Sequence, residues 1–322
     1  MRYKTARTLV FLLAGSTLGP ALAAEDPAQE EADDRTEVVQ KTENPEDEWY
    51  NPLVDVLFSG PPALGKRLEE EKKVSRRFSL LSHHPNYVLP ATWTPDPRQF
   101  QTSNPDPAPP ENVEIKFQIS FKVPVWEAPL GDESELSVGY TQQSWWQAYN
   151  SAASKPFRET NHAPEVFMDF LSDREILGFT HRITRLGILH QSNGRSEPFS
   201  RSWDRLYAQF VLERGGFVMS LRPWYRIPES ASEDDNPDIT DYMGYGDIGF
   251  AWRNGENVYS LMLRNNFDLD DNRGAIQVDW SFDISEDIRG YVQIFDGYGE
   301  SLIDYNESVT RIGIGIQLTG WL

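Results

Sequence analysis

The residues His190, Ser192 and Asp204 are of types that together perform nucleophilic catalysis. Serine attacks an ester only when a base removes its proton, and histidine commonly serves as that base. A carboxylate can hold the imidazole in the correct tautomer and stabilise the imidazolium. His190 and Ser192 are two residues apart, so on a β-strand their side chains lie on one face. The same spacing also suits the aqueous rim of a hairpin, so both interpretations stay open at this point.

The elements that would position these residues are amphipathic strands. Near the C-terminus, Ile312, Ile314 and Ile316 alternate with residues such as Arg311 and Gln317. We count roughly eleven or twelve such runs from Phe78 onward, separated by turns at 214–216 and 253–255. No window after residue 24 is apolar for eighteen residues, so no transmembrane helix is expected there. The sequence therefore predicts an all-β fold.

The chain begins with a basic head and a short apolar stretch that ends in Ala21-Leu22-Ala23. This pattern predicts a secretory signal peptide at 1–24, with a short membrane anchor as the alternative. Residues 25–77 open with a stretch, Glu25 to Glu48, that is rich in acidic residues and nearly free of apolar ones. We expect this segment to be largely disordered. The periodic part, 78–322, forms the expected third region.

Composition narrows the class of protein. The chain has no cysteine and a formal charge of −20. An exported chain without disulfides must close its structure by hydrogen bonds and packing alone, and a negative chain is a poor partner for nucleic acid. Dyad-repeat strands running to the last residue favour a transmembrane β-barrel, because closure pairs every backbone group in hydrocarbon. A soluble β-sandwich or a periplasmic barrel remains the alternative.

Strand parity then indicates where the three candidate residues point. His190 and Ser192 share parity with Leu186 and Ile188, and Asp204 shares parity with Leu206. If the apolar face is the lipid face, all three polar side chains face lipid. The register is imperfect, because Ile183 and Leu189 have the opposite parity. Ionisable groups facing lipid are costly, so a lipid substrate is one explanation, although the cost falls to about 0–1 kcal/mol near the interface.

Gln142 is a second polar residue with lipid-facing parity, within the apolar series Leu136, Val138 and Tyr140. A buried amide needs a hydrogen-bond partner, which a second copy of the barrel could supply. A register slip that turns Gln142 inward is the alternative.

The chain resembles the bacterial outer-membrane phospholipase A family. The resemblance lies in YTQQSWWQAYNSAASKPFRETNHAPEVF (140–167), HQSNGRSEPFSRSWDRLY (190–207), DDNPDITDYMGY (234–245) and GYGESLIDYN (297–306), and more weakly in HPNYVLPATW (84–93). It covers about residues 78–322. It implies a twelve-stranded antiparallel transmembrane β-barrel in the outer membrane of a Gram-negative bacterium. It also implies calcium-dependent hydrolysis of phospholipid acyl ester bonds by a homodimer.

The resemblance also implies residue roles. His190 matches the general base, Ser192 the nucleophile, and the backbone N–H of Gly194 the oxyanion donor. Ser200 and the carbonyl of Arg195 match calcium ligands from one subunit. Ser154 matches the ligand given by the other subunit, and Gln142 the polar residue of the dimer interface.

One position departs from the family pattern. The family's third catalytic residue is commonly asparagine, and here that position is Asp204. A carboxylate stabilises imidazolium more than an amide does, so we expect Asp204 to orient His190 and to shift the pH dependence of the reaction. The alternative function is a structural or transport barrel without activity. Interior side chains can largely fill a barrel of about twelve strands, which disfavours an open pore.

Overall fold

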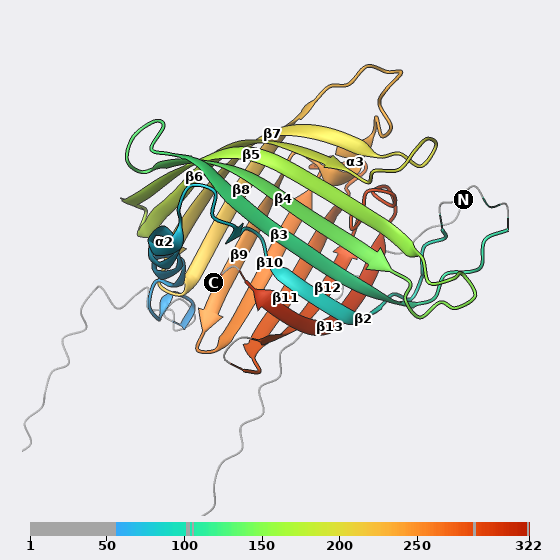
Figure 1. Cartoon of the computed structure of the whole chain (residues 1–322), viewed down its shortest axis with the longest axis horizontal. Helices are drawn as coiled ribbons and strands as arrows, with labels where there is room; N and C mark the ends of the chain where they lie inside the picture. Colours follow the sequence, from blue (N-terminus) through green and yellow to red (C-terminus); the bar gives the residue numbers. More distant parts are fainter. Residues whose placement is uncertain (1–55, 101–103, 105, 286–287, 321) are drawn as a thin grey trace, which may run out of the picture. The chain divides into compact units, whose positions relative to one another are not determined.

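The computed structural model describes residues 56–322 except 101–103, 105, 286–287 and 321. The predicted signal peptide and the stretch Glu25–Glu48 lie outside the described residues. The described chain is dominated by one antiparallel sheet (Figure 1). Its strands are β1 (Leu81–Ser82), β2 (Asn86–Trp93), β3 (Val113–Glu127), β4 (Ser134–Trp146), β5 (Phe157–Ile176), β6 (Phe179–Ser192), β7 (Ser202–Arg214), β8 (Phe217–Ile227), β9 (Gly246–Asn254), β10 (Asn257–Asn265), β11 (Gly274–Asp283), β12 (Arg289–Gly297) and β13 (Val309–Thr319), and its helices are α2 (Ala63–Val74) and α3 (Ile239–Met243).

The sheet closes on itself. Strands β3 to β13 pair in sequence order, β13 then pairs with β2, and β2 pairs with β3. This ring contains twelve strands, because the two-residue β1 only adds to the edge of β3. Closure leaves no strand edge unpaired, as a barrel in hydrocarbon requires. The predicted twelve-stranded antiparallel barrel is confirmed.

The two ends of the barrel differ in their connections. At one end, tight turns join β5 to β6, β7 to β8 and β9 to β10. Gly178, Gly215 and Gly255 in these turns have positive φ, which tight hairpins need. At the other end the connections are longer. They include residues 147–156, 193–201, 228–245, 266–273 and 298–308.

On the barrel strands the outward face is apolar, and the inward face carries most of the buried polar side chains. On β13, the side chains of Ile312, Ile314 and Leu318 are exposed, whereas Arg311 and Gln317 are buried in the interior. Exposed aliphatic side chains around a polar interior are the reverse of a soluble protein, and they match a surface that contacts lipid.

Ion pairs fill much of the interior near the long connections. Arg158 lies 3.1 Å from Glu114 and also pairs with Asp304. Lys116 lies 3.1 Å from Glu300, which also pairs with Arg311 at 2.8 Å. These pairs compensate buried charges in this part of the interior.

Helix α2 lies beside the end with the tight turns (Figure 1). The buried carboxylate of Glu213 on β7 accepts hydrogen bonds from the backbone N–H groups of Leu64 at 2.7 Å and Gly65 at 3.1 Å. It therefore satisfies two N–H groups that a helix start leaves unpaired. This packed helix lies within residues 25–77, which we expected to be largely disordered. That expectation does not hold for residues 63–74, because the helix packs on the barrel. Among the described residues, no helix is long and apolar enough to cross a membrane.

The seam between β2 and β13 joins the two ends of the sheet. Its register shifts between Ile314 and Ile316 and again between Gln317 and Thr319. A Cβ at Gly315 would lie 2.0 Å from the carbonyl oxygen of Val88. Only glycine therefore allows the two strands to approach this closely.

Candidate functional site

His190 and Asp204 are directly paired residues of β6 and β7. His190 Nδ1 lies 2.8 Å from Asp204 Oδ1, and both side chains are a little under half exposed. An ionised carboxylate can only accept, so Nδ1 donates this hydrogen bond, and in the neutral imidazole Nε2 keeps a free lone pair. This is the state of a histidine that acts as a base.

The pair lies on the outer surface of the barrel. Leu186 and Ile188 on β6, and Leu206 on β7, have the same parity as the pair and are exposed. Ser192 ends β6 two residues after His190, on the same face. Ile183 and Leu189, whose parity disagreed, pack against buried clusters inside the barrel. A register shift in the pairing of β6 with β7 lies between His181 and Ile183.

The loop 193–201 follows Ser192 and is held together by Asn193. The buried Asn193 side chain accepts from the backbone N–H of Arg201 at 3.0 Å and donates to the carbonyl of Phe199 at 2.9 Å. Gly194 has φ of +64°, which suits glycine. Arg195 and Ser200 lie on this same loop, three and eight residues after Ser192 in the sequence. Sequence reasoning missed Asn193, although Asn-Gly is a turn signal.

His162 is a further residue that sequence reasoning missed. It is the direct partner of Ser192 across β5 and β6, and the direct partner of Gln142 across β4 and β5. Its Nδ1 lies 2.7 Å from the hydroxyl of Tyr140. A Cβ built on Gly194 would lie 3.8 Å from His162 Nε2. A second imidazole therefore borders the predicted nucleophile and oxyanion donor.

Gln142 and Ser154 lie on other elements than the His190–Asp204 pair. Gln142 lies on β4, where its side chain accepts from Tyr140 Oη at 3.2 Å and donates to Ser144 Oγ at 3.2 Å. It has the same parity as the exposed Val138. Ser154 is exposed in the loop 147–156, at the end of the barrel that also carries loop 193–201.

A shallow apolar groove of about 430 Å³ lies on the outer face near the site. It includes Leu186 and Ile188, which precede His190 on β6, and Leu206, which follows Asp204 on β7. Leu136, Val166 and Met168 form its other apolar walls. The groove is the size of a small ligand site and has almost no polar lining.

A closed barrel with an apolar outside, a polar inside and a histidine–carboxylate pair on its outer surface defines a β-barrel membrane protein with a surface site. A family-wide sequence model described as Phospholipase A1 matches residues 64–318. The chain belongs to the phospholipase A1 family, and the resemblance drawn from the sequence is confirmed.

Individual relatives agree. The phospholipase A1 of Klebsiella pneumoniae is 43% identical over 244 residues, which cover 75% of this chain and 82% of the relative. That of Escherichia coli K12 is 41% identical with the same coverage. The structure of outer membrane phospholipase A from E. coli matches with a TM-score of 0.70 and 39% identity, over 76% of this chain and 100% of that one.

Two further solved structures concern the site. The Salmonella typhi outer membrane phospholipase is a dimer with bound calcium, and it matches with a TM-score of 0.70 and 39% identity, over 76% of this chain and 94% of that one. An active-site mutant of the E. coli enzyme, in which asparagine is replaced by alanine, matches with a TM-score of 0.70 and 38% identity.

Proposed function

We propose that this protein hydrolyses acyl ester bonds of phospholipids in the outer membrane of a Gram-negative bacterium. The observation that carries the proposal is the His190–Asp204 pair, 2.8 Å apart on the outer barrel surface, with Ser192 beside it on the same face. A site that faces the membrane meets its substrate by lateral diffusion within the lipid. The apolar groove below His190 offers a surface for an acyl chain.

Each residue has a role in the proposed reaction. Asp204 holds the Nδ1–H of His190, so Nε2 takes the proton of Ser192 as its oxygen attacks the ester carbon. The backbone N–H of Gly194 donates to the oxyanion that forms. The imidazolium then gives its proton to the departing alcohol, and water hydrolyses the acyl-serine by the same steps.

Calcium fits the residues of loop 193–201. The Ser200 hydroxyl and the Arg195 carbonyl are oxygen donors, as Ca²⁺ prefers, and Asn193 fixes the loop that carries them. Ser154 of the partner subunit would supply a further oxygen. When bound, the ion would add positive charge next to the oxyanion site.

A homodimer is part of the proposal, because the ligand set is completed only across two chains. Gln142 lies on the outer face with exposed apolar neighbours, where a second barrel can pack. An amide in such an interface gains a partner and leaves lipid. The calcium-bound dimer of the Salmonella typhi relative supports this assembly.

A structural or transport barrel without activity is the alternative. On that alternative, the His190–Asp204 pair would have no function, although it lies on a surface where polar groups are costly. The interior ion pairs also oppose an open pore.

The decisive experiment measures fatty-acid release from mixed phospholipid–detergent micelles by the refolded protein. Wild type should release fatty acid with calcium and lose that activity in chelator. Ser192→Ala should lower the rate by at least about 10⁴-fold, because the nucleophile is removed. Gln191→Ala, whose side chain lies on the opposite face of β6, is the matched control. Wild type that releases no fatty acid in calcium, or a Ser192→Ala variant equal to wild type, would overturn the proposal.

A further inference from the structure

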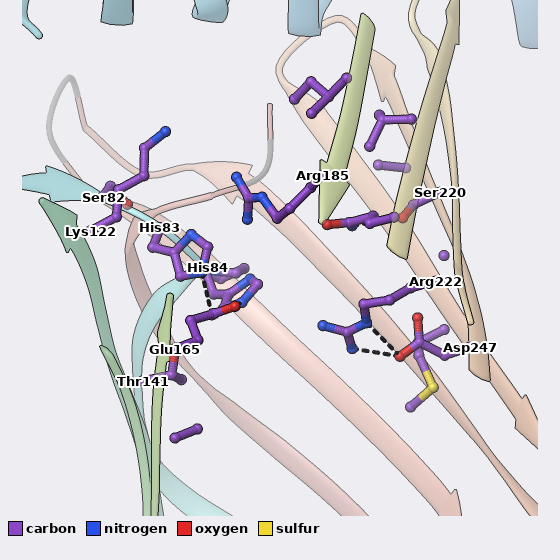
Figure 2. Close-up of a pocket in the computed structure, with 18 of the residues that line it drawn as sticks. Ser82, His83, His84, Lys122, Thr141, Glu165, Arg185, Ser220, Arg222 and Asp247 are labelled. Atoms are coloured by element: carbon purple, nitrogen blue, oxygen red, sulfur yellow. Dashed lines mark hydrogen bonds and ion pairs between the residues drawn. The ribbon is translucent and has the colours of Figure 1, made fainter. Parts of the chain in front are cut away.

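Two adjacent histidines enter the barrel interior at a break in its first strand. His83 and His84 lie between β1, which ends at Ser82, and β2, which begins at Asn86. Successive residues of a regular strand point to opposite faces, but the break allows both rings to line the interior cavity (Figure 2). Their ring centroids are 4.0 Å apart.

Both imidazoles converge on one carboxylate oxygen. His83 Nε2 lies 2.6 Å from Glu165 Oε1, and His84 Nε2 lies 3.8 Å from the same atom. The nitrogen and oxygen atoms that the three residues offer all lie within 4.8 Å of one another. The two imidazoles and the carboxylate therefore offer three ligand atoms around one position.

Neighbouring side chains fix the cluster. The Tyr207 hydroxyl donates to the other carboxylate oxygen of Glu165, which leaves Oε1 directed at the histidines. The Phe167 ring stacks on His83 at 5.1 Å with an interplanar angle of 11°. Side chains that orient ligating residues in this way are typical of metal sites.

Two arginines that line the same cavity are paired with carboxylates. Arg185 makes two hydrogen bonds to Asp169, at 2.6 and 2.8 Å. Arg222 pairs with Asp247 across the cavity (Figure 2). A divalent ion at the histidines would therefore meet two neutralised arginines and one carboxylate. The cavity of about 660 Å³ also has room for water ligands.

We propose that His83, His84 and Glu165 form a site for a divalent transition-metal ion of the Zn²⁺ type. Imidazole nitrogens with a carboxylate suit Zn²⁺, whereas Ca²⁺ takes an all-oxygen ligand set. The site is therefore distinct from the proposed calcium site on the outer surface. Bonds of about 2.0–2.2 Å would need only small side-chain rotations from the present positions. The ion would link the broken first strand to β5 and stabilise the barrel.

The test uses the refolded full chain in detergent, stripped with chelator and titrated with Zn²⁺. We expect wild type to bind one tight equivalent and to gain thermal stability. The double variant His83→Gln/His84→Gln should weaken that equivalent by at least about 100-fold and lose the gain in stability. The double variant His162→Gln/His181→Gln, which removes two histidines outside the cluster, should keep both. If His83→Gln/His84→Gln fails to refold, Glu165→Gln is used in its place and should show the same loss of Zn²⁺ binding and of the gain in stability.

Three results would overturn the proposed site. The first is wild type that binds no Zn²⁺ tightly. The second is unchanged Zn²⁺ binding in the His83→Gln/His84→Gln or Glu165→Gln variant, and the third is loss of tight Zn²⁺ binding in the His162→Gln/His181→Gln control. Zinc binding and thermal stability are both measured without substrate, so failure of the proposed hydrolysis would not affect the outcome.

Discussion

His162 and Ser192 are direct cross-strand partners of β5 and β6, and the hydroxyl of Tyr140 hydrogen bonds to Nδ1 of that histidine. With Nδ1 engaged by a phenol, Nε2 is available to a bound ester or head group. We expect His162→Phe, which keeps a flat ring without donors, to lower kcat/KM about tenfold, the equivalent of ~1.4 kcal/mol. Separate kcat and KM values with a phospholipid substrate check this. His181→Phe on β6 is the control, and a change below about twofold in His162→Phe would rule out a direct role.

Replacing Asp204 separates orientation from charge. Asp204→Asn keeps a hydrogen-bond acceptor for His190 Nδ1 but removes the charge that stabilises the imidazolium. The base then stays unprotonated at lower pH, so the acidic limb of the rate profile should move to lower pH while activity falls less than about tenfold. Asp204→Ala should lose about 10²-fold, because nothing orients the ring. Inactive Asp204→Asn protein that folds and dimerises normally would contradict this role.

A site shared between two chains predicts rescue by mixing. Homodimers of Ser154→Ala and of Ser192→Ala should each be impaired, the first in calcium binding and the second in chemistry. In a mixed dimer, one site combines an intact Ser192 with an intact partner serine. Equal mixing before dimerisation should restore about a quarter of wild-type activity, from half the dimers with one good site each. If the mixture has only the average activity of the two homodimeric variants, each chain acts without a residue from its partner.

The loops beside the site carry a pH-dependent contact. The Glu197 carboxyl, when protonated, donates a hydrogen bond to the Asp235 carboxylate, which raises the pKa of Glu197 above its usual value of about 4.3. The contact needs a shared proton, so it stabilises the loops below the ordinary pKa and is lost as pH rises through the raised pKa. We expect amide-exchange protection in 193–201 to be higher at acidic pH than at neutral pH. Glu197→Gln should remove this difference and Glu233→Gln should keep it; equal protection in wild type at both pH values would contradict the contact.

The strands and the face of the site could be predicted from sequence because both follow from a period of two. Alternation in residues such as Ile312 and Ile314 reveals which side chains face outward without any knowledge of pairing. The same parity placed His190 and Asp204 on the outer surface, where the structure pairs them.

The other contacts of the site depend on strand register, which the alternation of apolar and polar residues does not specify. His162 faces Ser192 only because β5 and β6 pair with that particular offset. Shifting the offset by one residue would turn it to the other face. The docking of α2 on Glu213 and the convergence of His83 and His84 on Glu165 likewise join residues far apart in the sequence. Each is a contact of tertiary structure, and no local pattern marks it.

The seam between β2 and β13 has a consequence for the order of assembly. β13, the last barrel strand to be synthesised, must pair with β2, the first strand of the ring. The barrel therefore cannot close until β13 has been exported. A chain that ends before Val309 would keep eleven strands with two open edges, each a template for pairing with other chains. Premature termination should therefore yield aggregated or degraded protein and no partly active barrel. Only a chain that includes β13 can close the barrel.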